Sequence, residues 1–84
     1  MTREQILEVV LKHIRSNVFG LDGLPIATSQ SMLDLGASSL DVIEIVSASM
    51  RELRVRVPRT RLTGLKNIDE LVDALYDAKE EAIG

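Results

Sequence analysis

Residues 34–45 read DLGASSLDVIEI, a polar turn followed directly by an apolar pattern with helical spacing. Gly36 allows a sharp turn, and Ser38 can cap a helix that we expect from about Ser39 to Glu52, with Asp41 three residues after the cap. The start of such a helix exposes a hydroxyl group beside free backbone N–H groups, which favour a nearby anion. The stretch therefore predicts a central helix and an accessible serine at its first turn.

This helix is expected to have one buried arc and one polar face. The arc consists of Val42, Ile43, Ile45, Val46, Ser49, Met50 and Leu53. Leu40 falls on the opposite face, together with Asp41, Glu44, Ser47 and Arg51. An apolar side chain exposed beside the serine favours a contact with another protein.

Two further long helices are expected on either side, from about Arg3 to Val18 and from about Ile68 to Glu81. Thr2 with Gln5, and Asn67 with Glu70, have the spacing of reciprocal N-terminal caps. Each helix carries one apolar stripe. The stripes are Ile6, Leu7, Val10, Leu11, Ile14 and Val18 in the first helix, and Ile68, Leu71, Val72, Leu75 and Tyr76 in the last.

The connections complete the predicted fold. A long loop spans about residues 20–38, and its apolar residues are expected to fix it to the core. These residues are Leu24, Ile26, Met32, Leu33 and Leu35. Residues 53–57 alternate like a strand, but no second strand pattern exists, so we expect an extended loop and then a short helical turn around residues 58–62. The prediction is an all-α bundle of three main helices and one short helix, in a single domain over residues 1–84.

Composition excludes several classes of function. The 84 residues contain no cysteine and one histidine, so neither a disulfide framework nor a zinc site is expected, and we predict no metal and no catalytic residue. His13 is expected at the boundary of the first apolar stripe. The net charge of −3 and the two aromatic residues argue against nucleic-acid binding, despite five arginines between residues 51 and 61. No signal peptide or membrane span is recognisable, so a cytoplasmic protein is expected.

The sequence LGASSLD, followed by VIEI, closely resembles the phosphopantetheine attachment motif of acyl carrier proteins. The similarity extends over nearly the whole chain, including the long first loop and the start of the last helix at Asn67 and Ile68, and it implies that the helical bundle is acyl-carrier-protein-like. It implies that a phosphopantetheinyl transferase attaches 4′-phosphopantetheine from coenzyme A to Ser39, and not to Ser38. The arm then holds acyl groups as thioesters, and the protein acts as a monomeric carrier, not as an enzyme.

The same resemblance implies partner enzymes and contacts. The partners would be ketosynthases, acyltransferases or enzymes similar to HMG-CoA synthase, and the predicted contacts are Leu40, Asp41, Glu44, Arg59 and Arg61. Most family members have an aspartate before the modified serine, where this chain has Ser38, which indicates an altered choice of partner. Residues 53–76 are similar to free-standing carriers of polyketide β-branching cassettes, which implies an acetyl or malonyl donor.

Other interpretations remain. Ser39 could be part of a cap only, in a small helical adaptor that binds proteins without modification. A serine hydrolase would need a base, and His13 is the one histidine available. Among carriers, the fatty-acid and peptide systems are alternatives to the polyketide system. Acyl chains could also lodge between the second and last long helices, beside Val46, Met50 and Leu71, although for short groups these residues are expected to be ordinary core.

Overall fold

The helices form where the apolar periodicity predicts them. The computed structural model describes residues 1–21 and 23–83, with side chains up to Glu81. Its elements are α1 (Arg3–Asn17), α2 (Ser39–Leu53), α3 (Arg59–Leu62) and α4 (Ile68–Ile83), and the described residues contain no strand. The all-α fold of three main helices and one short helix is therefore confirmed, with the ends of the long helices within two residues of the expected positions.

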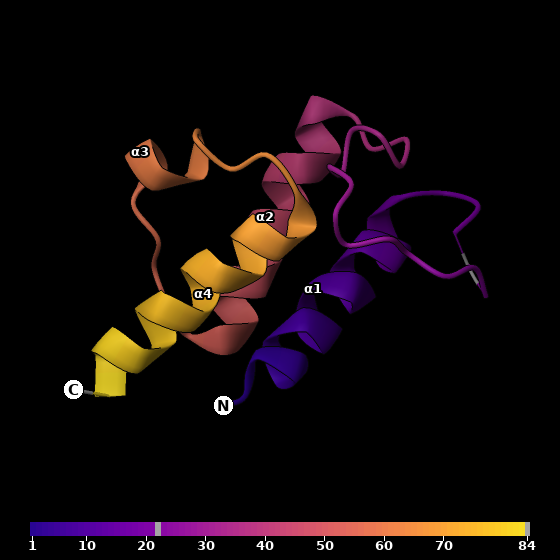
Figure 1. The fold of residues 1–84 in the computed structure, drawn as a ribbon. Coiled ribbons are helices and arrows are strands. Elements are labelled where there is room, and N and C mark those ends of the chain that lie inside the picture. The colour runs from indigo at the N-terminus through magenta and orange to yellow at the C-terminus, as the bar shows by residue number, and fades with distance from the viewer. Residues whose placement is uncertain (22, 84) are drawn as a thin grey trace.

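The three long helices pack around a common axis, with α1 antiparallel to both α2 and α4 (Figure 1). The short α3 packs against α4 and is joined to α2 by an extended segment. Arg54 ends α2 in the left-handed conformation, with φ of 57°, which turns the chain away from the helix axis. The alternating residues after it are extended without being part of a sheet, as expected.

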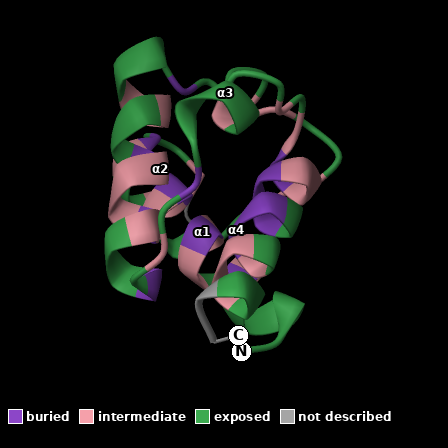
Figure 2. Cartoon of the chain, turned by 90° about the vertical axis from the view of Figure 1, so that its left-hand side faces the viewer, coloured by how far each residue is buried: buried purple, intermediate pink, exposed green. Residues whose placement is uncertain are grey.

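The core is aliphatic and lies where α1, α2 and α4 face one another (Figure 2). Ile6, Val10 and Ile14 of α1 pack with Ile45 of α2 and with the buried face of α4. That face consists of Ile68, Leu71, Val72, Ala74 and Leu75. Ser49 is also fully buried, and its hydroxyl finds no hydrogen-bond partner among the described residues. The predicted stripes thus meet in one core, with Leu7, Leu11 and Tyr76 partly buried at its edge.

Three apolar residues were wrongly predicted to be buried. Leu24 is 52% exposed and Leu33 is 59% exposed, so they do not fix the long loop to the core, whereas Ile26, Met32 and Leu35 do pack against it. Ile43 is 61% exposed. Leu33 and Ile43 instead line a surface groove, described below, and Leu24 lies on the loop surface.

Hydrogen bonds hold the long loop in place. The backbone N–H groups of Ile68 and Asp69 donate to the carbonyl oxygens of Gln30 and Thr28, at 3.1 and 3.0 Å, which joins the loop to the start of α4. The Arg15 guanidinium donates to two loop carbonyls, those of Leu21 and Leu24, at 2.9 Å each. Because its backbone is tied at both points, the loop delivers the start of α2 in a defined orientation.

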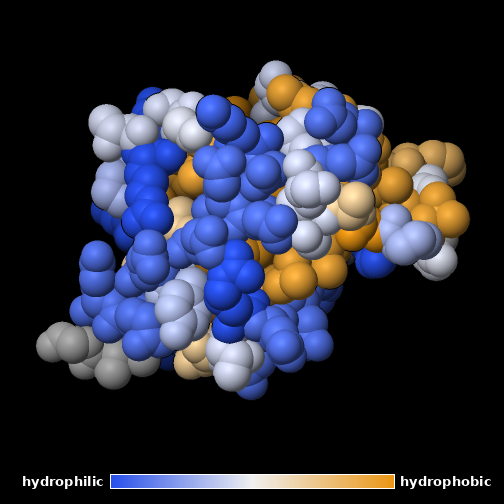
Figure 3. All heavy atoms as spheres, viewed as in Figure 1, coloured by the Kyte–Doolittle hydropathy of each residue, from blue (hydrophilic) through white to orange (hydrophobic). Residues whose placement is uncertain are grey.

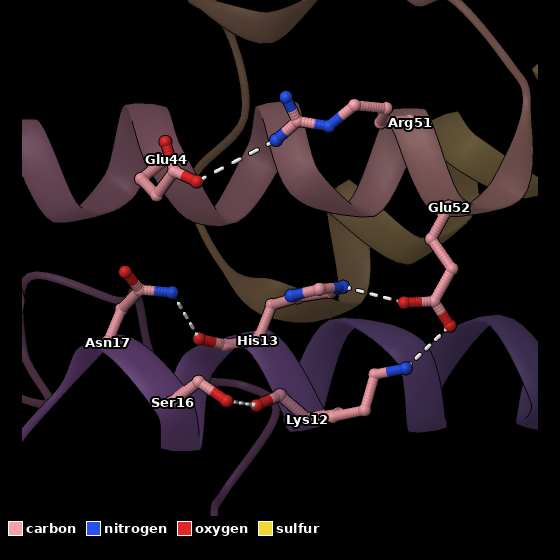
Figure 4. Close-up of polar contacts among 7 residues, drawn as sticks. All are labelled: Lys12, His13, Ser16, Asn17, Glu44, Arg51 and Glu52. Atoms are coloured by element: carbon pink, nitrogen blue, oxygen red, sulfur yellow. Dashed lines mark hydrogen bonds and ion pairs between the residues drawn. The ribbon is translucent and has the colours of Figure 1, made fainter.

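Polar contacts also tie α1 to the end of α2 (Figure 4). His13 Nε2 lies 2.9 Å from Glu52 Oε1, and Lys12 Nζ lies 2.6 Å from Glu52 Oε2. These two contacts lower the pKa of the Glu52 carboxyl, and the hydrogen bond from Lys12 is the larger cause. His13 thus occupies the boundary position that its place in the sequence predicts.

The surface is mostly polar on the face seen in Figure 3, with apolar groups gathered around the start of α2 and over the loop after α1. Within the described part of the chain, no helix has the length and apolar character needed to cross a membrane.

Candidate functional site

The two adjacent serines at the start of α2 differ in what their hydroxyl groups contact. Ser38 is the N-cap: its Oγ accepts a hydrogen bond from the Asp41 N–H at 3.1 Å, and its own N–H donates to Asp41 Oδ2 at 2.9 Å. This is a complete capping box, which confirms the predicted cap. Ser39, the first helical residue, is exposed, and no hydrogen bond to its hydroxyl is found among the described residues.

The turn before α2 aims this serine outward. Gly36 adopts a φ of 103°, a left-handed value that a side chain would strain. The N–H groups of Leu35 and Ala37 both donate to the Met32 carbonyl, at 3.1 Å, so the turn closes on itself. A nucleophilic hydroxyl held in this way is open to an approaching enzyme. It also lies beside the first-turn N–H groups, where an attached phosphate would be stabilised.

An open groove of about 910 Å³ begins at Ser39. It runs along α2 and is bounded on the other side by residues 56–67 and by the start of α4. Its walls are mainly apolar, and they bring together Val46, Met50 and Leu71, the three residues named from sequence as neighbours of a carried chain. The exposed Ser39 hydroxyl therefore stands at one end of a long, mainly apolar wall.

The predicted partner contacts are distributed over two surfaces. Leu40, 78% exposed, and Glu44 lie on α2 next to Ser39, while the Asp41 carboxylate is engaged in the capping box. Arg59 lines the groove across from α2. Arg61 points elsewhere, because its guanidinium donates to Asp77 of α4 at 2.8 Å.

Sequence reasoning left Leu33, Ile43 and Lys66 out of this region, and it treated Arg56 only as part of an arginine-rich segment that could contact a partner or the arm. Leu33 and Ile43 were assigned to the core, although Ile43 is one turn after Ser39 and therefore shares its face of α2. Arg56 and Lys66 also line the groove. The alternation of residues 53–57 showed that Arg56 differs in direction from Val57, but the element that Arg56 faces became visible only in the folded chain.

His13 is too far from Ser39 to act as its base. Its ring is paired with Glu52 in the last turn of α2, and Ser39 is the first residue of that helix. Glu52 follows Ser39 by thirteen positions along the helix, which corresponds to about 20 Å. The described residues also contain no cluster of His, Asp and Glu that could hold a metal ion.

A family model and the relatives of known sequence point to the same family. Residues 9–75 match the family model "Phosphopantetheine attachment site". The polyketide biosynthesis acyl-carrier-protein AcpK of Bacillus subtilis (strain 168) is 35% identical over 98% of this chain and 100% of its own length. An acyl carrier protein of Cyanidioschyzon merolae is 33% identical, over 95% of this chain and 88% of its own.

One solved structure is similar in fold as well as in sequence. It is the crystal structure of the curacin biosynthetic pathway HMG synthase in complex with acetyl donor-ACP, in which the matched chain is 36% identical, with a TM-score of 0.80. The match covers 90% of this chain and 96% of that one. From its fold, from the family match over most of its length and from these relatives, this chain belongs to the acyl carrier proteins, whose cofactor is covalently attached 4′-phosphopantetheine.

Proposed function

We propose that this protein carries acyl groups in polyketide biosynthesis, as thioesters on a phosphopantetheine arm esterified to Ser39. The observation that carries the choice of serine is the division of roles at the start of α2: the Ser38 hydroxyl is used by the capping box, whereas the Ser39 hydroxyl is exposed at the mouth of the groove. When bound, the arm supplies the thiol that a chain without cysteine lacks. Residues 1–84 would form one carrier domain.

The residues of the chain have three tasks in this function. A phosphopantetheinyl transferase would perform the attachment: Ser39 Oγ loses its proton and bonds to the phosphorus of the pantetheine phosphate, while the pyrophosphate bond of coenzyme A breaks and 3′,5′-ADP leaves. The first turn of α2 stabilises the phosphate charge next to it. The rest of the surface is for recognition, and the protein itself makes no bond in the acyl group. Tethering keeps the acyl group at a high effective concentration for successive enzymes.

The pathway is supported by two relatives. The Bacillus relative is a carrier of polyketide biosynthesis, and the similar solved structure contains an acetyl donor carrier bound to an HMG synthase. We propose that this chain likewise supplies an acetyl unit, or the malonyl unit from which acetyl is made, to an enzyme of the HMG-synthase type. Leu40 and Glu44 would contact that enzyme beside the arm, with Asp41 holding the turn and Arg59 and Arg61 at the edge of the contact.

Intact-mass measurement tests the attachment site. The purified apoprotein is incubated with coenzyme A and a transferase of broad specificity, together with the Ser39→Ala and Ser38→Ala variants. We expect the natural chain and Ser38→Ala to gain the mass of one arm, and Ser39→Ala to gain none. Ser38→Ala removes the cap and is expected to lose about 1 kcal/mol of stability, so circular dichroism should confirm that it is folded.

Two outcomes would contradict the proposal. If Ser39→Ala gains the arm while Ser38→Ala, still folded, does not, the attachment site is Ser38. If the natural chain stays unmodified with a transferase that modifies another carrier in the same tube, the chain would act as an unmodified adaptor.

A further inference from the structure

The groove that begins at Ser39 carries charge of one sign only. Arg56, Arg59 and Lys66 are among its lining residues, and no Asp or Glu is. The chain as a whole has a net charge of −3, with 13 acidic residues against 10 lysines and arginines. A groove wall that collects three cations and no carboxylate in such a chain attracts anions, and its apolar surroundings strengthen that attraction.

Unlike Arg51 and Arg61 of the same segment, the three groove cations have no internal partner in the part of the chain that the structure describes. Arg51 lies 3.7 Å from Glu44, and Arg61 lies 2.8 Å from Asp77. Within residues 1–21 and 23–81, by contrast, no ion pair or side-chain hydrogen bond involves Arg56, Arg59 or Lys66. Their charges are therefore available to a ligand in the groove.

The groove also has an apolar wall, so a ligand that fills it must match both apolar and cationic residues. Val46 and Met50 of α2 and Leu71 of α4 can contact methylene groups, while the cations stand on the wall formed by residues 56–66. A ligand that fits both has an apolar stem and an anionic tip. We propose that the groove binds an acyl group that ends in a free carboxylate, the half-thioester of a dicarboxylic acid, with Arg56, Arg59 and Lys66 holding the carboxylate.

This assignment rests on the proposed attachment of the arm to Ser39. The phosphodiester of the arm is a second anion, but it is bonded directly to Ser39 on α2, where the N-terminus of the helix already stabilises it. The cations belong to the opposite wall, where the far end of a folded-back arm would lie. Arginine and carboxylate form short, charge-assisted hydrogen bonds, so the tip of the acyl group is the better partner.

The test compares two acyl groups of similar length. The transferase loads the natural chain with malonyl or butyryl groups from the corresponding coenzyme A thioesters, and intact mass confirms loading. Amide spectra of the ¹⁵N-labelled proteins at pH 7 are then compared. We expect the malonyl group, but not the butyryl group, to shift the amide signals of residues 56–66 away from their positions in the unacylated holoprotein. The shifts should shrink in ~1 M salt, where the Debye length is about 3 Å.

Two double variants provide the matched comparison. In Arg56→Gln/Arg59→Gln the difference between the malonyl and butyryl spectra should fall to about half or less, because two of the three cations are removed. In Arg51→Gln/Arg54→Gln, which removes two arginines that do not line the groove, the difference should persist.

The outcomes separate this proposal from the proposed function. Absence of loading would contradict the attachment to Ser39. With loading complete, identical malonyl and butyryl spectra over residues 56–66 would overturn the carboxylate site. A difference between the malonyl and butyryl spectra that survives in Arg56→Gln/Arg59→Gln would also overturn it. So would a full shift of these amide signals from the apoprotein to the unacylated holoprotein, since the phosphodiester would then occupy the cations.

Discussion

Ser38 and Ser39, at the start of α2, have separate roles because they occupy different positions relative to the helix. A serine at the N-cap can accept a hydrogen bond from the third residue of the helix, whereas a serine at the first helical position has no such acceptor role. Ser38 therefore caps α2 with an uncharged side chain. The surface beside Ser39 gains no negative charge from this cap, and Leu40 and Ile43 are both exposed there.

We expect Leu40→Ala to weaken partner binding without weakening the fold. Leu40 is 78% exposed, so its removal should change the free energy of unfolding by no more than about 0.5 kcal/mol. If its side chain is an anchor for an HMG-synthase-type enzyme, the affinity of the holoprotein should fall about tenfold, or about 1.4 kcal/mol. Titration calorimetry and urea unfolding measure the two quantities.

Leu24→Ala is the control for this substitution. Leu24 is also exposed, but it lies on the loop after α1, where its carbonyl accepts a hydrogen bond from Arg15 of α1. The Leu24→Ala substitution should change neither the affinity of the holoprotein for the partner enzyme nor the free energy of unfolding. Equal affinity of Leu40→Ala and the natural chain would remove Leu40 from the contact surface.

At the scale of elements, the helices are joined by exposed ion pairs around an aliphatic core. Arg3 pairs with Asp73 between α1 and α4, and Glu52 of α2 pairs with Lys12 and His13 of α1. Lys79 of α4 donates to the Leu53 carbonyl at the end of α2, at 3.0 Å. Such exposed pairs contribute little individually, so they orient helices whose packing energy comes from the buried stripes.

The Glu52 contacts predict a pH dependence of stability. Lys12 and His13 hold the pKa of the folded Glu52 carboxyl below its ordinary value. A carboxyl whose pKa is lowered by folding stabilises the protein above the unfolded pKa, and this contribution is lost as the pH falls through the folded pKa. The natural chain should therefore be more stable than Glu52→Gln at neutral pH, and the difference should vanish in acid.

Urea unfolding at a series of pH values from neutral to acidic checks this expectation. The control is Glu44→Gln, because the ion-pair partner of Glu44, Arg51, lies on the same helix and not on α1. A stability difference between the natural chain and Glu52→Gln that is the same at every pH would show that the charge of Glu52 does not tie α1 to α2.

At the scale of the whole molecule, the groove is a product of the packing of α2, residues 56–67 and α4. We expect an octanoyl group to stabilise the loaded protein more than an acetyl group does. Each methylene that leaves water contributes about 0.8 kcal/mol when fully buried, and a gain of 1 kcal/mol raises the melting temperature of a domain of this size by about 4–8 °C. Thermal unfolding followed by circular dichroism compares the two forms. Equal midpoints would mean that the octanoyl chain remains in solvent.

Much of this architecture is visible in the amino-acid sequence. The three long helices and the short one were predicted because their signals are local: stripes with a period of 3.6 residues, and the caps at Thr2, Ser38 and Asn67. The family resemblance was also readable, because the residues around Ser39 are contiguous. The errors at Leu24, Leu33 and Ile43 have a common cause, since an apolar residue does not specify whether another element will cover it.

The sequence alone determined the helices, their caps and the serine that begins α2, because each depends on residues within a few positions of one another. Folding selects which apolar residues line a groove and which fill the core. It also places Arg56, Arg59 and Lys66 on one wall and pairs Arg61 with Asp77. The physical reason is that burial and charge pairing depend on contacts between distant segments, and a helical period defines a face without defining its neighbour.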